Sequence, residues 1–279
     1  MADSAFMTRY RDEYVAAFER RQSLLRDTVT VESEVRGNTA VFLVAGSGGA
    51  TATTRGVNGL IPARADDLTQ NSCTLEEWHD LVRKTGFNIF ASQGDQTRIM
   101  QETTMAVLNR KVDALIIAQA EGGTNDTGAA QTMSLALAAY ALAILGNNNA
   151  GGAGVYGVIT PSAFAYLLQT KEFGSAEYVN VKPFAATNEA IMSRFSWAGI
   201  EWIVHTGLTG AATNAEKCLI WNKRAIGQGI DKASLQTPVG RDEEQDYSWA
   251  RASAYMGAKR LQNSGIVVVN HDGSAHAAQ

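Results

Sequence analysis

The chain has 279 residues and a mass of 29.9 kDa, enough to bury a substantial core as one large domain or two interleaved ones. Its net charge of -4, from 24 basic and 28 acidic residues, gives no indication that the chain binds nucleic acids or anionic membranes. Two cysteines, Cys73 and Cys218, lack motif spacing, which fits free thiols in a reducing compartment.

Residues 4–26 predict an amphipathic helix, because Phe6, Tyr10, Tyr14 and Phe18 fall near one face. The first residues, MADSAFMTRYRDEY, contain acids and no apolar run, so we expect no secretory signal. The helix is interpreted either as a surface helix of its own domain or as an arm that lies on a neighbouring subunit.

Two strand-like runs, 28–34 and 39–45, are separated by a turn signal at residues 36–38. Residues 45–73 are then rich in Gly, Ala, Thr and Asn and contain almost no large apolar side chains. Such a segment cannot pack a core of its own, so it is either disordered or an extended loop ordered on something else. Because both flanks have β character, we favour a long protruding hairpin.

The glycine-rich residues 46–49 follow a strand and so resemble a dinucleotide-binding loop. That fingerprint requires a third small residue, where Thr51 stands, and a helix directly afterwards. The following TATTRGVNG is a poor helix start. We therefore expect no nucleotide, and no cofactor of another kind is predicted.

Residues 76–92 predict a strand, which leads into one long helix over residues 92–121. Ser92 and Asp95 have the form of a capping box, and two glycines end the helix after residue 121. Asp113 falls off its apolar stripe. Roughly 27 residues at 1.5 Å each give a rod of about 40 Å, which indicates a spine beneath a sheet. The stripe consists of Ile99, Met105, Leu108, Val112, Leu115 and Ile116.

From residue 122 to residue 170 the only charged side chain is Asp126. The uncharged run 129–145 is about the shortest length that spans a membrane but contains several polar residues, so we interpret it as a buried helix of a soluble protein. Further elements indicate an α/β subdomain from about 125 to 235: strands at 155–160, 199–205 and 217–221, and a helix at 161–170.

The C-terminal part begins with the acidic residues 242–246 and continues with residues 247–260, which alternate bulky with small or polar side chains. A turn at 263–265 leads into the apolar strand 266–270. We expect both strands to finish the sheet under the long helix.

The four histidines are too scattered to predict a site. His205 lies on an apolar run and is interpreted as a core histidine. His79 follows Cys73 by six residues, but no second ligand pair completes a zinc set. His271 and His276 are assigned to the polar tail.

The acidic residues 242–246 lack the spacing of a calcium loop, so a solvated or intersubunit charged loop is expected. Neither cysteine has a neighbouring histidine or acid that would make it a nucleophile. Four tryptophans lie mostly on strand patterns, which favours places in the core: Trp197, Trp202, Trp221 and Trp249.

The order of these elements resembles that of the major capsid (coat) proteins of tailed bacteriophages, which have the Hong Kong 97-type shell fold. Three runs carry the resemblance most clearly: GVNGLIPARADDLTQNSCTLEEWHDLVRKTGFNIFASQGDQ, TPSAFAYLLQTKEF and DEEQDYSWARASAYMGAKRLQNSGIVVVNHDGS. The resemblance covers essentially the whole chain and implies an α+β fold. It further implies an N-terminal arm helix at 1–27, an extension loop hairpin at 28–75, a peripheral domain with the spine helix at 76–121 and 241–272, an axial α/β domain at 122–240, and a polar tail at 273–279.

The function implied by the resemblance is self-assembly, through hexamers and pentamers, into the icosahedral shell that encloses the double-stranded DNA genome of a tailed phage. Scaffolding, portal and decoration proteins are the implied partners, with weak, non-specific DNA contact, no membrane, and assembly in the host bacterial cytoplasm. The alternative is a cytosolic α/β enzyme or ligand-binding protein with no recognisable motif. Residues 45–73 discriminate between the two, because a monomeric enzyme has little use for so long a hairpin without a core.

The charges of this hairpin predict how it is held. Arg55 and Arg64 are the only cations between residues 46 and 73, and Asp66 and Asp67 are the only acids. We expect Arg55 or Arg64 to pair with carboxylates of an adjacent copy, and the candidates are Asp242, Glu243 and Glu244. The alternative is that these arginines only keep the hairpin soluble.

Overall fold

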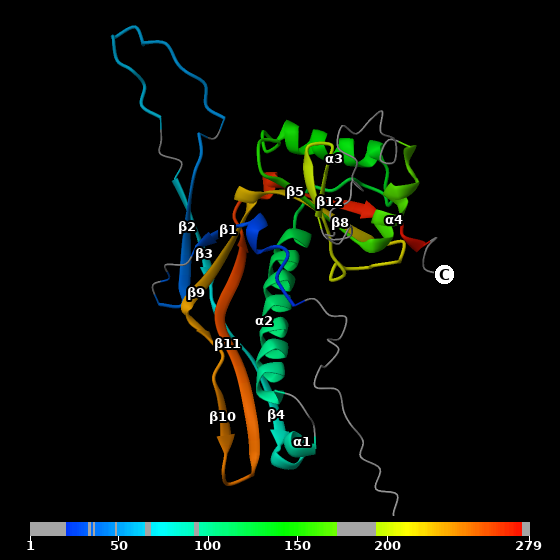
Figure 1. Ribbon diagram of the computed structural model, residues 1–279. Coiled ribbons are helices and arrows are strands. Elements are labelled where there is room, and N and C mark those ends of the chain that lie inside the picture. Colours follow the sequence, from blue (N-terminus) through cyan, green and yellow to red (C-terminus); the bar gives the residue numbers. More distant parts are fainter. Residues whose placement is uncertain are drawn as a thin grey trace, which may run out of the picture.

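The structure is a computed structural model that describes residues 21–32, 35, 37–47, 49–64, 68–91, 95–171 and 194–274. Figure 1 shows an elongated sheet lined along its length by helix α2, a second sheet beside helices α3 and α4, and a hairpin that projects away from both. Among the described helices, none is long and apolar enough to cross a membrane.

The first sheet has the strand order β1-β9-β11-β10, and β4 pairs with β11 as well. The central strand β11 is antiparallel to β4, β9 and β10, whereas β1 runs parallel to β9. Its alternating sequence places buried Ala250, Ala252 and Ala254 on one face, where small side chains let α2 pack closely. The strands are β1 (Thr30–Glu32), β4 (Glu76–Thr85), β9 (Ile226–Gln236), β10 (Val239–Asp242) and β11 (Tyr247–Arg260).

The long helix α2 spans Gln96–Glu121, as expected at its C-terminal end, but it begins four residues later than predicted. Its N-cap is Asp95, whose side chain accepts a hydrogen bond from the Arg98 amide at 3.1 Å. The predicted strand 76–92 is also too long, since it ends at Thr85 and Gly86–Ala91 form the short helix α1. The physical reason is local, because the Thr85 hydroxyl accepts from the Asn88 amide at 3.3 Å and so starts a helical turn.

The apolar stripe of α2 is confirmed for Leu108, Val112 and Ile116, which are buried. The prediction that Asp113 lies off the stripe is wrong, because this side chain is fully buried. Its cover comes from the segment that precedes β1. Residues 4–20 of the predicted helix 4–26 lie outside the described residues. Residues 21–25 are not helical, and Arg26–Thr28 form only the 3-10 turn η1.

The second sheet has the order β12-β8-β5-β7-β6 and buries Trp202 and Trp221 completely. Trp197 is also buried, which confirms the expected core positions of these three tryptophans, whereas Trp249 is half-buried. The strands are β5 (Val155–Ile159), β6 (Arg194–Trp197), β7 (Ile200–Val204), β8 (Glu216–Asn222) and β12 (Ile266–His271).

Two helices pack on this second sheet. Helix α3 (Leu135–Asn147) begins after the N-cap Ser134, later than predicted, and it is buried on one side only, with Tyr140 left 55% exposed. Helix α4 (Pro161–Gln169) has Thr160 as its N-cap, whose hydroxyl accepts from the Ala163 amide at 3.1 Å.

The strand composition of the two sheets differs from the prediction. β12 pairs with β8 and does not finish the sheet under α2, while β9, which was not predicted, pairs with β11. The expected ranges 122–240 and 241–272 therefore each contain a strand of the other sheet. His271 lies on β12 and is fully buried, so its assignment to the polar tail is wrong. Its Nδ1 lies 3.0 Å from the Met133 amide.

Candidate functional site

The hairpin consists of β2 (Thr39–Ala45) and β3 (Leu68–Thr74), which pair antiparallel along their whole length. Its root is seated on β9 through two glycines. A Cβ on Gly227 would lie 2.8 Å from the Phe42 ring, and one on Gly229 would lie 2.7 Å from the Ala40 Cβ. The glycines thus leave the space that the buried side chains of β2 occupy, and this seat fixes the direction of the hairpin.

The hairpin tip, defined here as residues 55–61, is held by hydrogen bonds of its own backbone, and the described part of the chain offers it no other hydrogen-bond partner. The Gly56 amide donates to the Leu60 carbonyl at 3.0 Å, and the Gly59 amide donates to the Gly56 carbonyl at 2.8 Å. Val57 is fully exposed, and Leu60 and Ile61 are 73% and 71% exposed. Three large apolar side chains therefore face solvent on a segment that has no core.

The charges of the hairpin remain at its exposed end. Arg55 and Arg64 are both exposed, and the Arg55 side chain has no partner within the described part of the chain. Asp66 and Asp67 lie outside the described residues. The hairpin tip thus presents one unpaired guanidinium beside three apolar side chains.

The opposite end of the first sheet carries a second exposed feature, the distal tip, which comprises α1 and the turn 242–246 between β10 and β11. The turn is organised around Asp242, whose Oδ1 accepts from the amides of Glu244 at 3.0 Å and Gln245 at 3.1 Å. These bonds and one from the Tyr247 hydroxyl hold the pKa of Asp242 below its usual range. Asp242 is thus committed within its own turn, which weakens the expectation that it meets a neighbour.

Asp246 of the distal tip and two arginines next to it, Arg241 and Arg83, are also engaged locally. Arg241 pairs with Asp246 at 2.6 Å, and the Arg83 guanidinium carbon lies 4.9 Å from the centre of the Tyr247 ring. By contrast, the carboxylates of Glu243 and Glu244 are exposed and have no partner among the described residues. Of the three predicted acceptors, these two remain available.

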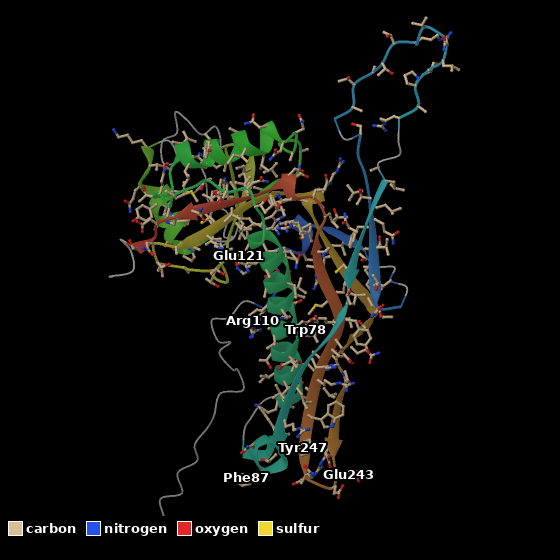
Figure 2. All side chains as sticks on the ribbon, turned by 180° about the vertical axis from the view of Figure 1, so that it is seen from behind. Trp78, Phe87, Arg110, Glu121, Glu243 and Tyr247 are labelled. Carbon is tan, nitrogen blue, oxygen red and sulfur yellow. The ribbon has the colours of Figure 1, made fainter. Side chains whose placement is uncertain are left out.

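Phe87, in the first turn of α1, is 74% exposed and was not among the predicted contact residues. Figure 2 shows Phe87 and Glu243 at the same end of the first sheet, with Tyr247 between them. The Gly86 amide joins the two parts by donating to the Asp246 carbonyl at 3.1 Å. The sequence did not indicate the exposure of Phe87, because GFNIFA continues the alternating pattern that predicts a strand over residues 76–92.

The structure does not bring the predicted contact residues together within one chain. The hairpin tip and the distal tip lie at opposite ends of the molecule, as Figure 1 shows. Arg55 and Arg64 therefore cannot reach Glu243 or Glu244 of the same copy.

A buried polar cluster ties the segment before β1 to helix α2 and to His205, which follows β7 of the second sheet. Asp113 of α2 accepts hydrogen bonds from the Ser23 hydroxyl at 2.6 Å, the amides of Leu24 and Leu25 at 3.2 Å each, and His205 Nε2 at 3.3 Å. Burial alone would raise the pKa of Asp113, but these donors outweigh it and hold the pKa below its ordinary value. The expectation of a satisfied core histidine at His205 is confirmed.

The cysteines and histidines form no reactive centre among the described residues. Burial raises the pKa of the Cys218 thiol to about 12 and raises that of Cys73 as well, so both are poor nucleophiles. His79 pairs with Glu77 at 3.0 Å on the surface, and His276 lies outside the described residues. No group of three metal-binding side chains occurs in the described ranges.

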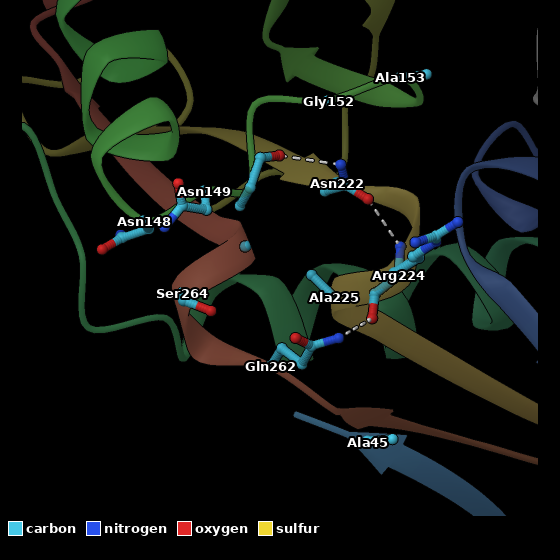
Figure 3. Close-up of a pocket in the computed structure, with 12 residues that line it drawn as sticks. Ala45, Asn148, Asn149, Gly152, Ala153, Asn222, Arg224, Ala225, Gln262 and Ser264 are labelled. Carbon is cyan, nitrogen blue, oxygen red and sulfur yellow. Dashed lines mark hydrogen bonds between the residues drawn. The ribbon is translucent and has the colours of Figure 1, made fainter. Parts of the chain in front are cut away.

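A cavity of about 390 Å³ lies beside the loop after α3, between Asn148, Asn149, Asn222, Gln262 and Ser264 (Figure 3). Several of its polar groups bind one another. The Asn222 side chain donates to the Ala150 carbonyl at 3.0 Å and accepts from the Arg224 amide at 3.1 Å. Among the described residues that line this cavity there is no acid, histidine or cysteine.

Comparison with known proteins gives a family model described as "Phage capsid protein" that matches residues 2–273. No curated protein matches the chain. A chain from Mycobacterium phage Che8 is similar in structure, with a TM-score of 0.75, 16% identity, and coverage of 97% of this chain and 98% of that chain. A capsid chain of a native GTA particle has a TM-score of 0.69 at 13% identity, with 96% of each chain covered. The capsid of Ralstonia phage GP4 has a TM-score of 0.69 at 10% identity, with 97% and 96% covered.

Proposed function

The chain belongs to the phage capsid protein family and is a major capsid protein with the expected Hong Kong 97-type shell fold. We propose that it builds the icosahedral shell around the double-stranded DNA genome of a tailed phage. Hexamers and pentamers are the proposed building units. The exposed hairpin carries this proposal, because a segment with three solvent-facing apolar side chains and no core of its own needs a neighbouring surface.

The hairpin is proposed to lie across an adjacent subunit. The conformational entropy of ordering it on that subunit is offset by the apolar area that the contact removes from water. The same exposed segment argues against the enzyme alternative, which nothing in the described residues favours.

We propose that Arg55 or Arg64 pairs with Glu243 or Glu244 of the adjacent copy. A desolvated interfacial pair contributes roughly 1.5–7 kcal/mol of coupling, whereas an exposed rim pair contributes little. Asp242 is a weaker candidate because its side chain already accepts hydrogen bonds within its own turn. Asp66 and Asp67, which precede β3 in the sequence, stay in the proposal as intersubunit contact residues. The competing hypothesis is that the arginines act only in solubility.

We further propose that the family's division into an N-terminal arm, extension loop, peripheral domain and axial domain applies here, with β9 in the peripheral domain and β12 in the axial domain. The sheet under α2, including β9, is then the peripheral domain, and the sheet of β5 to β8 with β12 is the axial domain.

Scaffolding, portal and decoration proteins are proposed partners, with assembly in the host bacterial cytoplasm before the chain becomes part of the virion. For the enclosed DNA we propose weak, non-specific contact on the inner surface, since 24 basic and 28 acidic residues leave no excess positive charge. A catalytic role is not part of the proposal.

Electron microscopy of the purified protein, with and without scaffold, tests the proposed function. The expected result is closed shells or rings of capsomer size. Only monomers or dimers at all concentrations, with scaffold and portal present, would refute it.

A further inference from the structure

We propose that Asn58 in the hairpin tip is a site of spontaneous deamidation, at which the Gly59 backbone nitrogen displaces the side-chain amide as ammonia. Asn58 and Gly59 form the only Asn-Gly pair in the sequence. The hairpin that carries them projects away from both sheets (Figure 1). The inference concerns the covalent chemistry of the unassembled subunit, so it goes beyond the proposed function and does not depend on it.

The surroundings of this pair leave it open to reaction. Both residues are exposed, and nothing lies within 4 Å of the position that a Cβ on Gly59 would occupy. Because glycine has no side chain, its nitrogen approaches the neighbouring Asn58 carboxamide without steric hindrance. Water, which is the second reactant, also has free access to an exposed tip.

The turn at the hairpin tip sets how readily the nitrogen reacts. The Gly59 amide donates to the Gly56 carbonyl at 2.8 Å, and this hydrogen bond must open before the nitrogen can lose its proton. Water replaces an exposed backbone hydrogen bond at little net cost. Segments with few buried contacts also open more readily than the core does. The turn therefore slows deamidation but does not prevent it.

The reaction needs only water. The Gly59 nitrogen loses its proton and bonds to Cγ of Asn58, while the bond from Cγ to Nδ2 breaks and ammonia leaves with the proton. The product is a five-membered succinimide ring. Water then opens this ring, which gives aspartate when the nitrogen bond to Cγ breaks and isoaspartate when the nitrogen bond to the backbone carbonyl carbon breaks.

Two other asparagines provide comparisons within the same chain. Asn71 and Asn263 are each followed by a serine, but both side chains are held in place. The Asn71 amide donates to the Leu261 carbonyl at 3.3 Å, within a strand pair. Asn263 accepts from the Thr124 amide at 3.1 Å and donates to the Thr124 hydroxyl at 2.6 Å. The Asn58 side chain, by contrast, has no hydrogen-bond partner among the described residues.

Deamidation changes the charge of the hairpin tip. The new carboxylate lies three residues after Arg55, whose guanidinium has no partner within the described part of the chain. This carboxylate then competes with any acid of a neighbour for the same guanidinium. Isoaspartate also lengthens the backbone by one carbon between Gly56 and Leu60, whose hydrogen bond closes the tip. A subunit that ages before assembly should therefore assemble less readily, and this consequence rests on the proposed function.

Peptide mass spectrometry of the unassembled wild-type subunit tests the site. Asn58 should lose its amide while Asn71 and Asn263 remain intact, and the loss should be several times faster at mildly alkaline than at neutral pH, because the attacking nitrogen must lose a proton. In urea the two control asparagines should react faster, since unfolding releases their side chains, whereas Asn58 should gain less. Deamidation of Asn58 no faster than that of Asn71 and Asn263 in the folded subunit would overturn the proposal.

Three substitutions separate the chemistry from its effect. Gly59→Ala places a methyl group beside the attacking nitrogen, and Asn58→Gln would require a larger ring, so both should suppress the loss of the amide. Thermal unfolding verifies that each variant folds. Undiminished deamidation of Asn58 in Gly59→Ala would refute attack by the Gly59 nitrogen. Asn58→Asp reproduces the product charge and should raise the critical concentration for assembly severalfold above that of Asn58→Gln, and equal values would refute the effect on assembly.

Discussion

Nε2 of His205 lies 3.3 Å from Oδ2 of Asp113, and both side chains are buried. The Gly207 amide donates to Nδ1 of the same ring at 2.9 Å, so the ring hydrogen is on Nε2, which donates a hydrogen bond to Asp113. Since Asp113 also holds Ser23, Leu24 and Leu25, one carboxylate connects the spine helix, the second sheet and the segment that leads in from the N-terminus.

Asp113→Asn should destabilise the subunit by about 2–3 kcal/mol, because the amide NH2 group must face buried donors that then lack an acceptor. Urea unfolding of the unassembled subunit measures this loss. Glu102→Gln is the control, since it weakens partly exposed ion pairs with Arg21 and Arg98 and should cost less than about 1 kcal/mol. Equal losses in the two variants would contradict the role of the cluster.

Acid should weaken the same cluster. The pKa of folded Asp113 is lowered, whereas an unfolded aspartate titrates near 3.9. The stabilisation from this group is therefore fully present above about pH 4, and it is lost as the pH falls through the lowered folded pKa. Unfolding measured down to about pH 3 should show a steeper loss in the wild type than in Asp113→Asn. Parallel curves would mean that Asp113 does not contribute.

The seat of the hairpin root predicts sensitivity at two glycines. Gly227→Ala and Gly229→Ala should each cost about 1–3 kcal/mol, because the added methyl overlaps Phe42 or Ala40. Hydrogen exchange should show faster exchange of the β2 and β3 amides in these variants. Gly146→Ala in α3 has nothing within 4 Å of the added Cβ and should gain up to about 1 kcal/mol from helix propensity. Hairpin amides that keep their protection would refute this account of the root.

Much of the fold could be predicted where apolar side chains recur regularly within one short segment of the chain. The stripe through Leu108, Val112 and Ile116 identified α2, and the alternation of residues 247–260 identified β11 with its correct ends. β9 escaped prediction because Gly227 and Gly229 interrupt its apolar pattern. Those glycines leave space for Phe42 and Ala40 of the hairpin, which lies far away in the sequence.

The candidate site was predictable in part, for a related reason. The scarcity of core residues identified the hairpin, and the charge count identified Arg55 and Arg64. Which acids are available depends on contacts that sequence does not reveal, since Asp242 is used within its turn and Glu243 is not. Likewise the burial of Asp113 and His271 comes from partners distant in the chain.

The pairing of the hairpin arginines predicts salt-dependent assembly. The double variant Arg55→Ala/Arg64→Ala should remain folded and should assemble more weakly than the wild type, with the largest difference at low salt, where charge attraction is least screened. Light scattering against protein concentration at two ionic strengths measures this. An unchanged critical concentration would mean that backbone and apolar contacts alone hold the hairpin.

The most direct test of the central claim is negative-stain electron microscopy of the wild-type chain, beside a variant in which residues 55–61 are replaced by a short glycine-serine turn. We predict rings or closed shells for the wild type. The shortened chain should remain a folded monomer, because the two sheets keep their core while the contact between copies is lost. Shells formed equally well by both chains would contradict the claim that the hairpin tip joins one copy to the next.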